Sequence, residues 1–199
     1  MNYQFGEIVN RNLIQQHLTD LQQFDLNELK SETQKKAFWI NIYNGMTNYV
    51  IIERQIQQSM KEAEGIFRQK IFSIGAMEFS LDDVEHGILR RNQRAMFSAS
   101  DPRLALQVDD LDYRIHFALN CGAQSCPMIA FYTTAQIEEE LAIAERSFIE
   151  QEFLVDIDKK RINCSPLFEW YRADFGKRFL DDSAYADFEV RLREYDWSI

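Results

Sequence analysis

The chain has 199 residues, of which 46% are hydrophobic, and its formal net charge is -10. Its 15 Phe, 8 Tyr and 3 Trp supply enough apolar surface for a buried core, which excludes a wholly disordered chain. The acidic excess argues against nucleic acid as a partner, because that binding relies on Lys and Arg to neutralise phosphates.

The sequence also indicates a compartment. The N-terminus lacks the basic region and apolar run of a signal peptide, and no stretch reaches the length of a membrane span. We therefore expect a cytoplasmic protein with no membrane partner. Three cysteines are an odd number and thiols stay reduced in the cytoplasm, so a disulfide scaffold is not expected. No pattern indicates a cofactor, and none is expected.

The first half of the chain predicts three helices and a hairpin. Ser31 and Gln34 form a capping-box pattern ahead of a segment that is apolar nearly all round, as a buried central helix is. Gly75 marks the turn of the hairpin. In chain order, the expected elements are an amphipathic helix over 6–24, the central helix to Ile52, a hairpin over 70–79 and a helix from Ser80 to about Phe97.

The second half mixes short strands with helices. Asp101-Pro102 interrupts the chain, and Ser165-Pro166 provides a cap and a first-turn proline for a helix. In chain order, the expected elements are strands at Leu104–Val108 and Tyr113–Leu119, a helix over about 134–150 capped by Thr133, a hairpin from Phe153 to Cys164, the helix after Pro166 and a last helix from about Ser183.

Together these elements predict a helix-rich α+β fold with a small, mostly antiparallel sheet. No repeat, low-complexity tract or interdomain linker divides the chain. We expect a single domain over residues 1–199. Within it, residues 1–30 would form a helical appendage, residues 31–180 the core and residues 181–199 a C-terminal helix.

One short run concentrates the groups that can carry chemistry: Arg114-Ile-His-Phe-Ala-Leu-Asn-Cys-Gly-Ala-Gln-Ser-Cys-Pro127. It holds His116 and two of the three cysteines, Cys121 and Cys126. Side chains of equal parity share a face of a strand, so His116 and Cys121 would face apart unless the backbone turns near Gly122. The loop could equally bring Cys126 back towards His116.

A neighbouring cation, a helix N-terminus or a hydrogen-bonded histidine lowers the pKa of a thiol and makes it a better nucleophile. This favours Cys126 or Cys121 as a nucleophile with His116 as its base. The alternative is structural, because buried free cysteines pack as small hydrophobic residues and a histidine can be a hydrogen-bonded core residue. A structural zinc ion needs four close ligands, so no metal is expected.

Asparagines form a polar stripe on the apolar central helix. Asn41, Asn44 and Asn48 lie at positions i, i+3 and i+7, and a buried amide costs free energy unless it is paired. We favour amides that fix the backbones of neighbouring loops. The alternative is a stripe that faces an internal polar pocket and binds a ligand.

A second polar cluster lies in the helix expected after Ser80. Glu85 and His86 are followed one turn later by Arg90, and Gly87 in mid-helix costs about 1 kcal/mol relative to Ala, which indicates close packing. A surface ladder of ion pairs is one interpretation. The other is a pocket where a carboxylate orients His86 and Arg90 binds an anion.

Five runs in this order resemble the domain of unknown function 547 family. They are Ala37-Phe-Trp-Ile-Asn-Ile-Tyr-Asn-Gly, Val84-Glu-His-Gly-Ile-Leu-Arg, Asp101-Pro-Arg, the run Arg114–Pro127 and Phe168-Glu-Trp-Tyr-Arg-Ala-Asp-Phe. The resemblance implies no established activity. It carries over onto Asn41, Asn44, Glu85, His86, Arg90, Arg114, His116, Cys121, Ser125 and Cys126.

Two classes of function follow. The enzyme hypothesis is a thiol-dependent hydrolase or acyl transferase that acts on a small amide, thioester or peptide. Its catalytic residues would be Cys126 or Cys121, His116, Glu85 and His86, and its substrate-binding residues would be Asn41, Asn44, Arg90, Arg114 and Ser125. The alternative is a protein-binding module in which the Cys/His run is structural. An open cleft lined by His116 and a cysteine would favour the enzyme.

Overall fold

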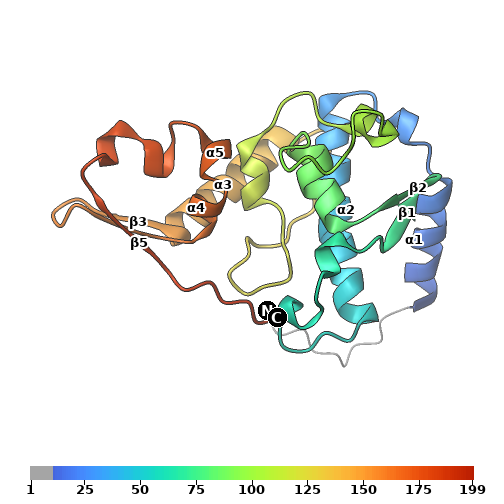
Figure 1. The fold of residues 1–199 in the computed structure, drawn as a ribbon, viewed down its shortest axis with the longest axis horizontal. Coiled ribbons are helices and arrows are strands. Elements are labelled where there is room, and N and C mark those ends of the chain that lie inside the picture. Colours follow the sequence, from blue (N-terminus) through green and yellow to red (C-terminus); the bar gives the residue numbers. More distant parts are fainter. Residues whose placement is uncertain (1–10) are drawn as a thin grey trace.

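A computed structural model describes residues 11–199 (Figure 1). In these residues the α-helices are α1 (Arg11–Gln23), α2 (Glu32–Glu53), α3 (Ile137–Glu152), α4 (Leu167–Trp170) and α5 (Arg172–Phe175). An antiparallel hairpin pairs β1 (Phe72–Ile74) with β2 (Met77–Phe79), and a second sheet has the order β3 (Phe153–Asp156), β4 (Arg161–Cys164), β5 (Glu189–Leu192). The predicted helix-rich α+β fold is confirmed. None of the helices described is long and apolar enough to cross a bilayer.

Short tight turns connect these elements. The 3₁₀ turns are η1 (Leu26–Glu28), η2 (Met60–Glu62), η3 (Ile66–Arg68), η5 (Pro102–Leu106), η6 (Tyr113–Phe117), η7 (Phe179–Asp181) and η8 (Ser183–Tyr185), and η4 (Asp83–Leu89) is a π-helix. Two of them position the candidate site, because η4 packs on α2 and η6 packs on α3.

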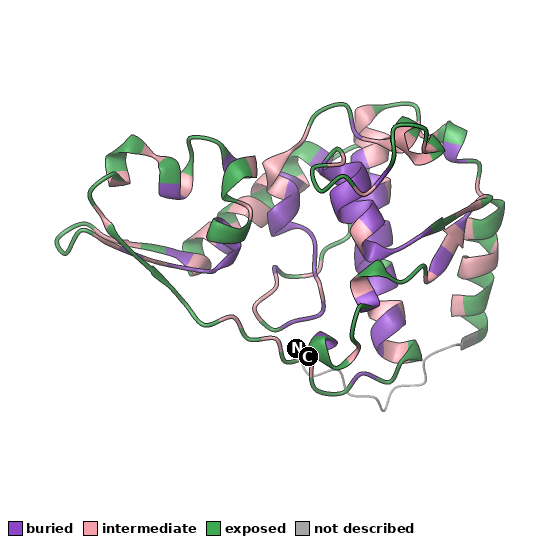
Figure 2. Ribbon diagram, in the orientation of Figure 1, coloured by how far each residue is buried: buried purple, intermediate pink, exposed green. Residues whose placement is uncertain are grey.

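The central helix α2 forms as predicted. The Ser31 side chain accepts the Gln34 N–H at 3.1 Å, and the Gln34 side chain accepts the Ser31 N–H at 2.9 Å, which completes a capping box. Trp39 and Ile40 are fully buried, and most of the helix is buried on several sides (Figure 2). α2 therefore serves as the scaffold on which the other elements pack.

Both predicted hairpins are present, and so is the first helix in its described part. α1 covers Arg11–Gln23 of the expected 6–24, and residues 6–10 lie outside the described residues. Gly75 adopts φ +57° in the turn between β1 and β2 and donates its N–H to the Leu21 carbonyl of α1 at 2.9 Å. α3 and the β3–β4 hairpin also form close to the expected positions.

The two strands expected at Leu104–Val108 and Tyr113–Leu119 are wrong. Asp101 and Asp112 each accept the backbone N–H two residues on, and each pairs with the arginine at that position, Arg103 or Arg114. An aspartate bound to its own local backbone stabilises a turn in place of a ladder. The segments are therefore η5 and η6. The parity argument about His116 does not apply, because His116 lies on a 3₁₀ turn.

Two predicted helices also differ. The helix expected from Ser80 to Phe97 winds as the π-helix η4 and ends at Leu89, and residues such as Arg91 and Asn92 then adopt positive φ. The last helix expected from Ser183 is wrong: after η8 the chain forms β5, which pairs in parallel with β4. The edge of β4 supplies backbone partners for this segment, which local helix propensity cannot outweigh.

A second apolar cluster lies under the β3–β4–β5 sheet. It is built mainly from phenylalanines of η6, α3, β3 and the α4–α5 region: Phe117, Phe148, Phe153, Phe168 and Phe175. The central cluster lies around α2 and the first hairpin. The two groups of elements lie side by side along the long axis of the molecule, with η6 and the loop after it between them (Figure 1).

Candidate active site

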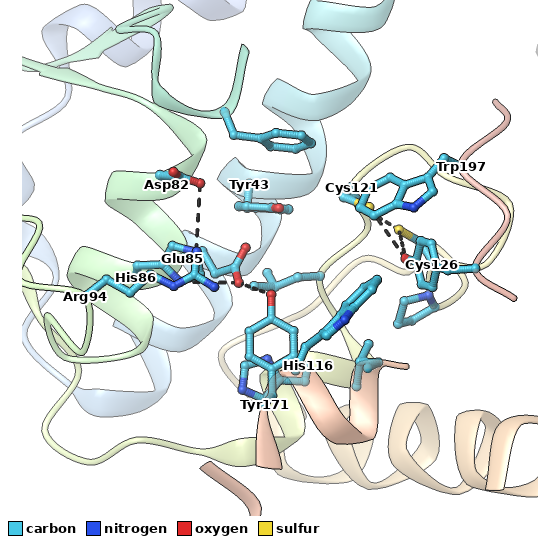
Figure 3. A pocket seen from close by; sticks show the side chains of 16 residues that line it. Tyr43, Asp82, Glu85, His86, Arg94, His116, Cys121, Cys126, Tyr171 and Trp197 are labelled. Atoms are coloured by element: carbon cyan, nitrogen blue, oxygen red, sulfur yellow. Dashed lines mark hydrogen bonds and ion pairs between the residues drawn. The ribbon is translucent and has the colours of Figure 1, made fainter. Parts of the chain in front are cut away.

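A cavity of about 280 Å³ opens beside η4, η6 and the loop that carries the two cysteines. It collects five of the residues singled out in the sequence, which enter from different elements (Figure 3). They are Glu85, His86, His116, Cys121 and Cys126. The rest of the wall includes the aromatic residues Tyr43, Phe67, Trp170, Tyr171, Tyr195 and Trp197.

His116 is oriented by a buried ion pair. Its Nε2 lies 2.7 Å from Asp174 Oδ2, and the guanidinium of Arg90 binds both oxygens of the same carboxylate, at 2.6 and 3.0 Å. Burial raises the pKa of Asp174, but His116 and Arg90 outweigh it and lower the pKa to about 2. A carboxylate can only accept, so Nε2 carries the proton and Nδ1 carries the lone pair.

The imidazole of His116 is neutral and fixed in orientation. Burial lowers the pKa of His116, more than the Asp174 hydrogen bond raises it. The ring also stacks on Tyr171, with centroids 3.8 Å apart and an interplanar angle of 21°. Nδ1 makes no hydrogen bond to residues 11–199. His116 therefore presents one basic nitrogen, which is what a general base requires.

Glu85 lies at one end of the cavity. Its Oε1 accepts the Tyr171 hydroxyl at 2.6 Å and lies 3.5 Å from His86 Nδ1 (Figure 3). Burial alone would raise the pKa of Glu85, but His86, the Tyr171 hydroxyl and His116 lower it below its ordinary value. Glu85 is therefore a carboxylate at neutral pH.

His86 is held as a neutral ring. The Arg90 guanidinium, which can only donate, lies 3.0 Å from His86 Nδ1, so that nitrogen accepts. Burial lowers the pKa of His86 and neighbouring arginines add to this. Its Nε2 lies 3.9 Å from Asp82 Oδ1. Arg90 thus bridges His86 and the Asp174–His116 pair from behind the cavity.

The π-helix explains why these groups are buried on one element. An extra residue in the turn changes which side chains face α2, and such turns are frequent at functional sites. Gly87 allows this turn to pack against Phe97, because a Cβ at position 87 would lie 2.3 Å from the Phe97 ring. The predicted close packing at Gly87 is therefore present.

The two cysteines lie at the other end of the cavity (Figure 3). Gly122 turns the chain with φ +89°, and Asn120 closes the loop by binding the Gly122 N–H at 2.8 Å and the Pro127 carbonyl at 2.7 Å. The Cys126 sulfur accepts the Cys121 N–H at 3.1 Å. The Tyr195 hydroxyl lies 3.1 Å from the same sulfur and 3.7 Å from the Cys121 sulfur.

These contacts shift the pKa values of the two thiols in opposite directions. Burial raises the pKa of Cys126, but hydrogen bonds from Cys121, Tyr195 and two backbone amides lower it to about 7. The hydrogen bond to Cys126 and burial raise the pKa of Cys121 well above its ordinary value. Burial and the two thiols raise the pKa of Tyr195, so its hydroxyl stays protonated and donates. The negative charge therefore belongs on Cys126.

The sequence model of one family matches residues 26–149, and its description is protein of unknown function, DUF547. That match covers more than half of the chain. The chain belongs to the DUF547 family. Comparison with curated proteins and comparison with solved structures each gave no match.

The DUF547 match ends before several residues of the cavity. Tyr171 of the cavity wall and Asp174, which binds His116 without lining the cavity, lie in the run Phe168–Phe175, which contributed to the resemblance, although neither was singled out. Tyr195, Trp170 and Trp197 were also missed. Tyr195 and Trp197 reach the cavity through backbone bonds of the C-terminal segment to the cysteine loop, such as the Gln124 N–H to the Ser198 carbonyl at 2.8 Å.

Five other predicted site residues do not line this cavity. Asn41 and Asn44 fix loop backbones, as favoured above: Asn41 binds the N–H and carbonyl of Tyr132, and Asn44 binds the Asn120 N–H at 2.8 Å and the Ala118 carbonyl at 3.0 Å. The remaining three also bind other parts of the protein. Arg90 pairs with Asp174, and Arg114 pairs with Asp112 and Glu138. The Ser125 hydroxyl accepts the Asp196 N–H.

Proposed function

We propose that this DUF547 protein is a thiol-dependent hydrolase or acyl transferase with Cys126 as its nucleophile. One observation carries the proposal: the Cys126 sulfur receives two hydrogen bonds, from Tyr195 and from the Cys121 N–H, and lines the same cavity as His116, whose Nε2 is held by Asp174. A stabilised thiolate and an oriented neutral imidazole are the two groups that acyl transfer through a thioester requires.

The chemistry would proceed in two halves. His116 takes the proton of the Cys126 thiol, and the thiolate attacks the substrate carbonyl carbon, so that a C–S bond forms. The bond from that carbon to the leaving amine or thiol then breaks, and His116 returns the proton to the leaving group. In the second half His116 takes a proton from water, whose oxygen attacks the thioester. The C–S bond breaks, and Cys126 regains the proton.

The remaining polar groups have roles in the same mechanism. Tyr195 stays protonated and stabilises the sulfur whenever it is negative. Asp174 keeps the His116 tautomer fixed and stabilises the imidazolium that forms after proton transfer. Glu85 lies at the opposite end of the cavity from the sulfurs (Figure 3), where a carboxylate suits the part of the substrate that carries hydrogen-bond donors. Cys121, Cys126 and Cys164 are free thiols, as the mechanism requires.

Thiol alkylation tests the proposal without a known substrate. Iodoacetamide should modify Cys126 at neutral pH faster than a model thiol, whose pKa is about 8.5. Cys164 provides an internal control, because burial raises its pKa to about 11. Mass spectrometry of the adducts over a range of pH separates the three cysteines. If Cys126 reacts no faster than the model thiol, the enzyme proposal fails and the structural interpretation of the run is favoured.

Hydrolysis of activated esters and thioesters provides the second test. A panel of p-nitrophenyl esters and acyl thioesters should be cleaved by the wild type, and Cys126→Ser and His116→Asn should each abolish the turnover. Cys164→Ser should retain it, because Cys164 lies in the apolar cluster beneath the second sheet. Turnover that survives Cys126→Ser would exclude Cys126 as the nucleophile.

A further inference from the structure

The chain that follows Cys126 has an unpaired backbone. Residues 127–133 contain neither a turn nor a bend. Within the part of the chain that the structure describes, the N–H and carbonyl groups of Met128, Ile129, Ala130 and Phe131 form no hydrogen bond. Such a segment resembles the free edge strand of a sheet, which pairs readily with another extended chain.

The segment is held at both ends, so its free backbone is a fixed feature. The Pro127 carbonyl accepts Asn120 Nδ2 at 2.7 Å. At the other end, Asn41 accepts the Tyr132 N–H at 3.0 Å and donates to the Tyr132 carbonyl at 2.7 Å. Between these anchors the side chains of Met128 and Phe131 are 73% and 76% exposed. Two large apolar side chains at this exposure, beside a free backbone, mark an interaction surface.

A second cavity, of about 250 Å³, lies between this segment and α3. Its wall includes Cys126, which also lines the first cavity, so the two cavities meet at the candidate nucleophile. The segment contributes Met128, Ile129 and Ala130, and α3 contributes Ile143, Ala144 and Phe148. The groove therefore has an apolar strip along Met128–Ala130 and α3, and Cys126 belongs to its wall.

The charge of α3 restricts the occupant. The helix carries six glutamates and one arginine. Glu139 and Glu150 are exposed, lie four and seven residues from Ile143, and form no ion pair within residues 11–199. The groove wall includes two more glutamates, Glu140, which binds Thr133, and Glu152, which pairs with Arg193, and no lysine or arginine among the described residues. An occupant with basic groups is favoured over an anionic one.

We propose that this groove binds the substrate as an extended stretch of polypeptide, an inference that rests on the function proposed above. The peptide backbone would pair with Met128–Phe131, as in strand addition to a sheet edge. An apolar side chain would pack against Ile143, and a basic one would lie near Glu139 or Glu150. A peptide bound in this way would place one of its backbone carbonyls beside Cys126. An acyl chain would fill the apolar floor but would leave the four backbone positions unpaired.

Peptide aldehydes test the proposal, because an aldehyde adds reversibly to a thiol and shields it. The probe is the tetrapeptide aldehyde acetyl-Lys-Leu-Val-leucinal, and the readout is the rate of Cys126 alkylation by iodoacetamide. Two comparison probes differ from it in one respect each, the same peptide with N-methylated backbone amides and the same peptide with Glu in place of Lys, and a third, dodecanal, replaces the peptide by an acyl chain. We expect the parent peptide to protect at concentrations about tenfold lower than any of the three.

A pair of matched variants locates the site. Ile143→Lys places a cation in the groove and should remove the advantage of the basic peptide. Ile157→Lys makes the same change at another exposed isoleucine, in the turn between β3 and β4. In this variant the basic peptide should still protect better than the peptide with Glu. Equal protection by dodecanal, or by the N-methylated peptide, would overturn the peptide inference.

Acetaldehyde distinguishes the two levels of the proposal. If acetaldehyde protects a rapidly alkylated Cys126 but the peptide is no better per mole, the nucleophile stands and the peptide groove is wrong. If Cys126 is alkylated no faster than the model thiol, the enzyme proposal fails and the groove proposal fails with it.

Discussion

The hydroxyl of Tyr195 lies 3.1 Å from the sulfur of Cys126, although 69 positions separate the two residues in the sequence. Together with the hydrogen bonds from Cys121, this contact lowers the pKa of Cys126 and stabilises a negative charge on its sulfur. The Cys121 sulfur lies further from the same hydroxyl, at 3.7 Å, and its own N–H points to Cys126. A C-terminal segment far from the Cys/His run in sequence therefore contributes to the chemistry of that run.

The first prediction concerns Tyr195→Phe. Removing the hydroxyl removes a donor to the sulfur, so the thiolate is less stable and the pKa of Cys126 rises from about 7 towards its ordinary value. The midpoint of the pH profile of Cys126 alkylation should shift to higher pH. Tyr185→Phe is the control, since Tyr185 packs on Phe153 and Phe188 away from the site. An unchanged midpoint in Tyr195→Phe would contradict the assignment.

The second prediction concerns Asp174 and acid stability. The pKa of Asp174 is about 2 in the folded protein, against 3.8 ordinarily. A group whose pKa is lowered by folding stabilises the protein above its unfolded pKa, and this stability is lost as the pH falls through the folded pKa. The free energy of unfolding should therefore decrease from about pH 4 to about pH 2.

Asp174→Asn should reduce this pH dependence and also destabilise the protein at neutral pH. It leaves the buried guanidinium of Arg90 without its carboxylate, which costs about 3–5 kcal/mol. Part of the acid dependence should remain, because Asp112 also has a pKa of about 2. Urea unfolding as a function of pH measures both effects, with Asp158→Asn, at an exposed position in the turn between β3 and β4, as control. A variant as stable as the wild type would show that the pair contributes nothing to folding.

The third prediction concerns Asn44, whose amide supports the loop before the cysteines. Asn44→Ala leaves the Asn120 N–H and the Ala118 carbonyl buried without this partner. Each such group costs about 1–3 kcal/mol. Urea denaturation should show a loss in this range or above, and alkylation of Cys126 should lose its selectivity as the loop loosens. Asn27→Ala, in the exposed turn η1, should change stability by much less.

The fourth prediction compares two glycines in helices. A Cβ at Gly87 would lie 2.3 Å from the Phe97 ring, whereas at Gly45 of α2 nothing lies within 4 Å. Gly87→Ala should destabilise by about 1–3 kcal/mol because it overpacks the π-helix against a buried ring. Gly45→Ala should stabilise by up to about 1 kcal/mol through helix propensity. Thermal melts of both variants check the opposite signs, and equal signs would contradict the packing at Gly87.

Local patterns in the sequence were sufficient for part of the fold. The capping box at Ser31, the buried helix after it and the turn at Gly75 each depend on hydrogen bonds that close within a few residues. The clustering of polar groups on apolar segments also led to Glu85, His86, His116 and the cysteines, which share one cavity. The family followed from the order of the runs.

Local patterns failed where a side chain competed with the backbone. Apolar alternation at residues 113–119 favours a strand, but Asp112 binds the Arg114 N–H and its guanidinium and turns the segment into η6. The segment after Ser183 favours a helix by composition, but the edge of β4 provides backbone partners and makes it β5. In both places one specific contact outweighs a weak propensity.

The sequence alone determined which residue types this protein gathers, because the patterns that place them are local. Only the tertiary structure decided their roles. The partner of His116 lies 58 positions away, that of Cys126 lies 69 away and that of Arg90 lies 84 away. The protonation state of a buried group depends on such partners and on the loss of water around it, and both arise only when the chain is packed.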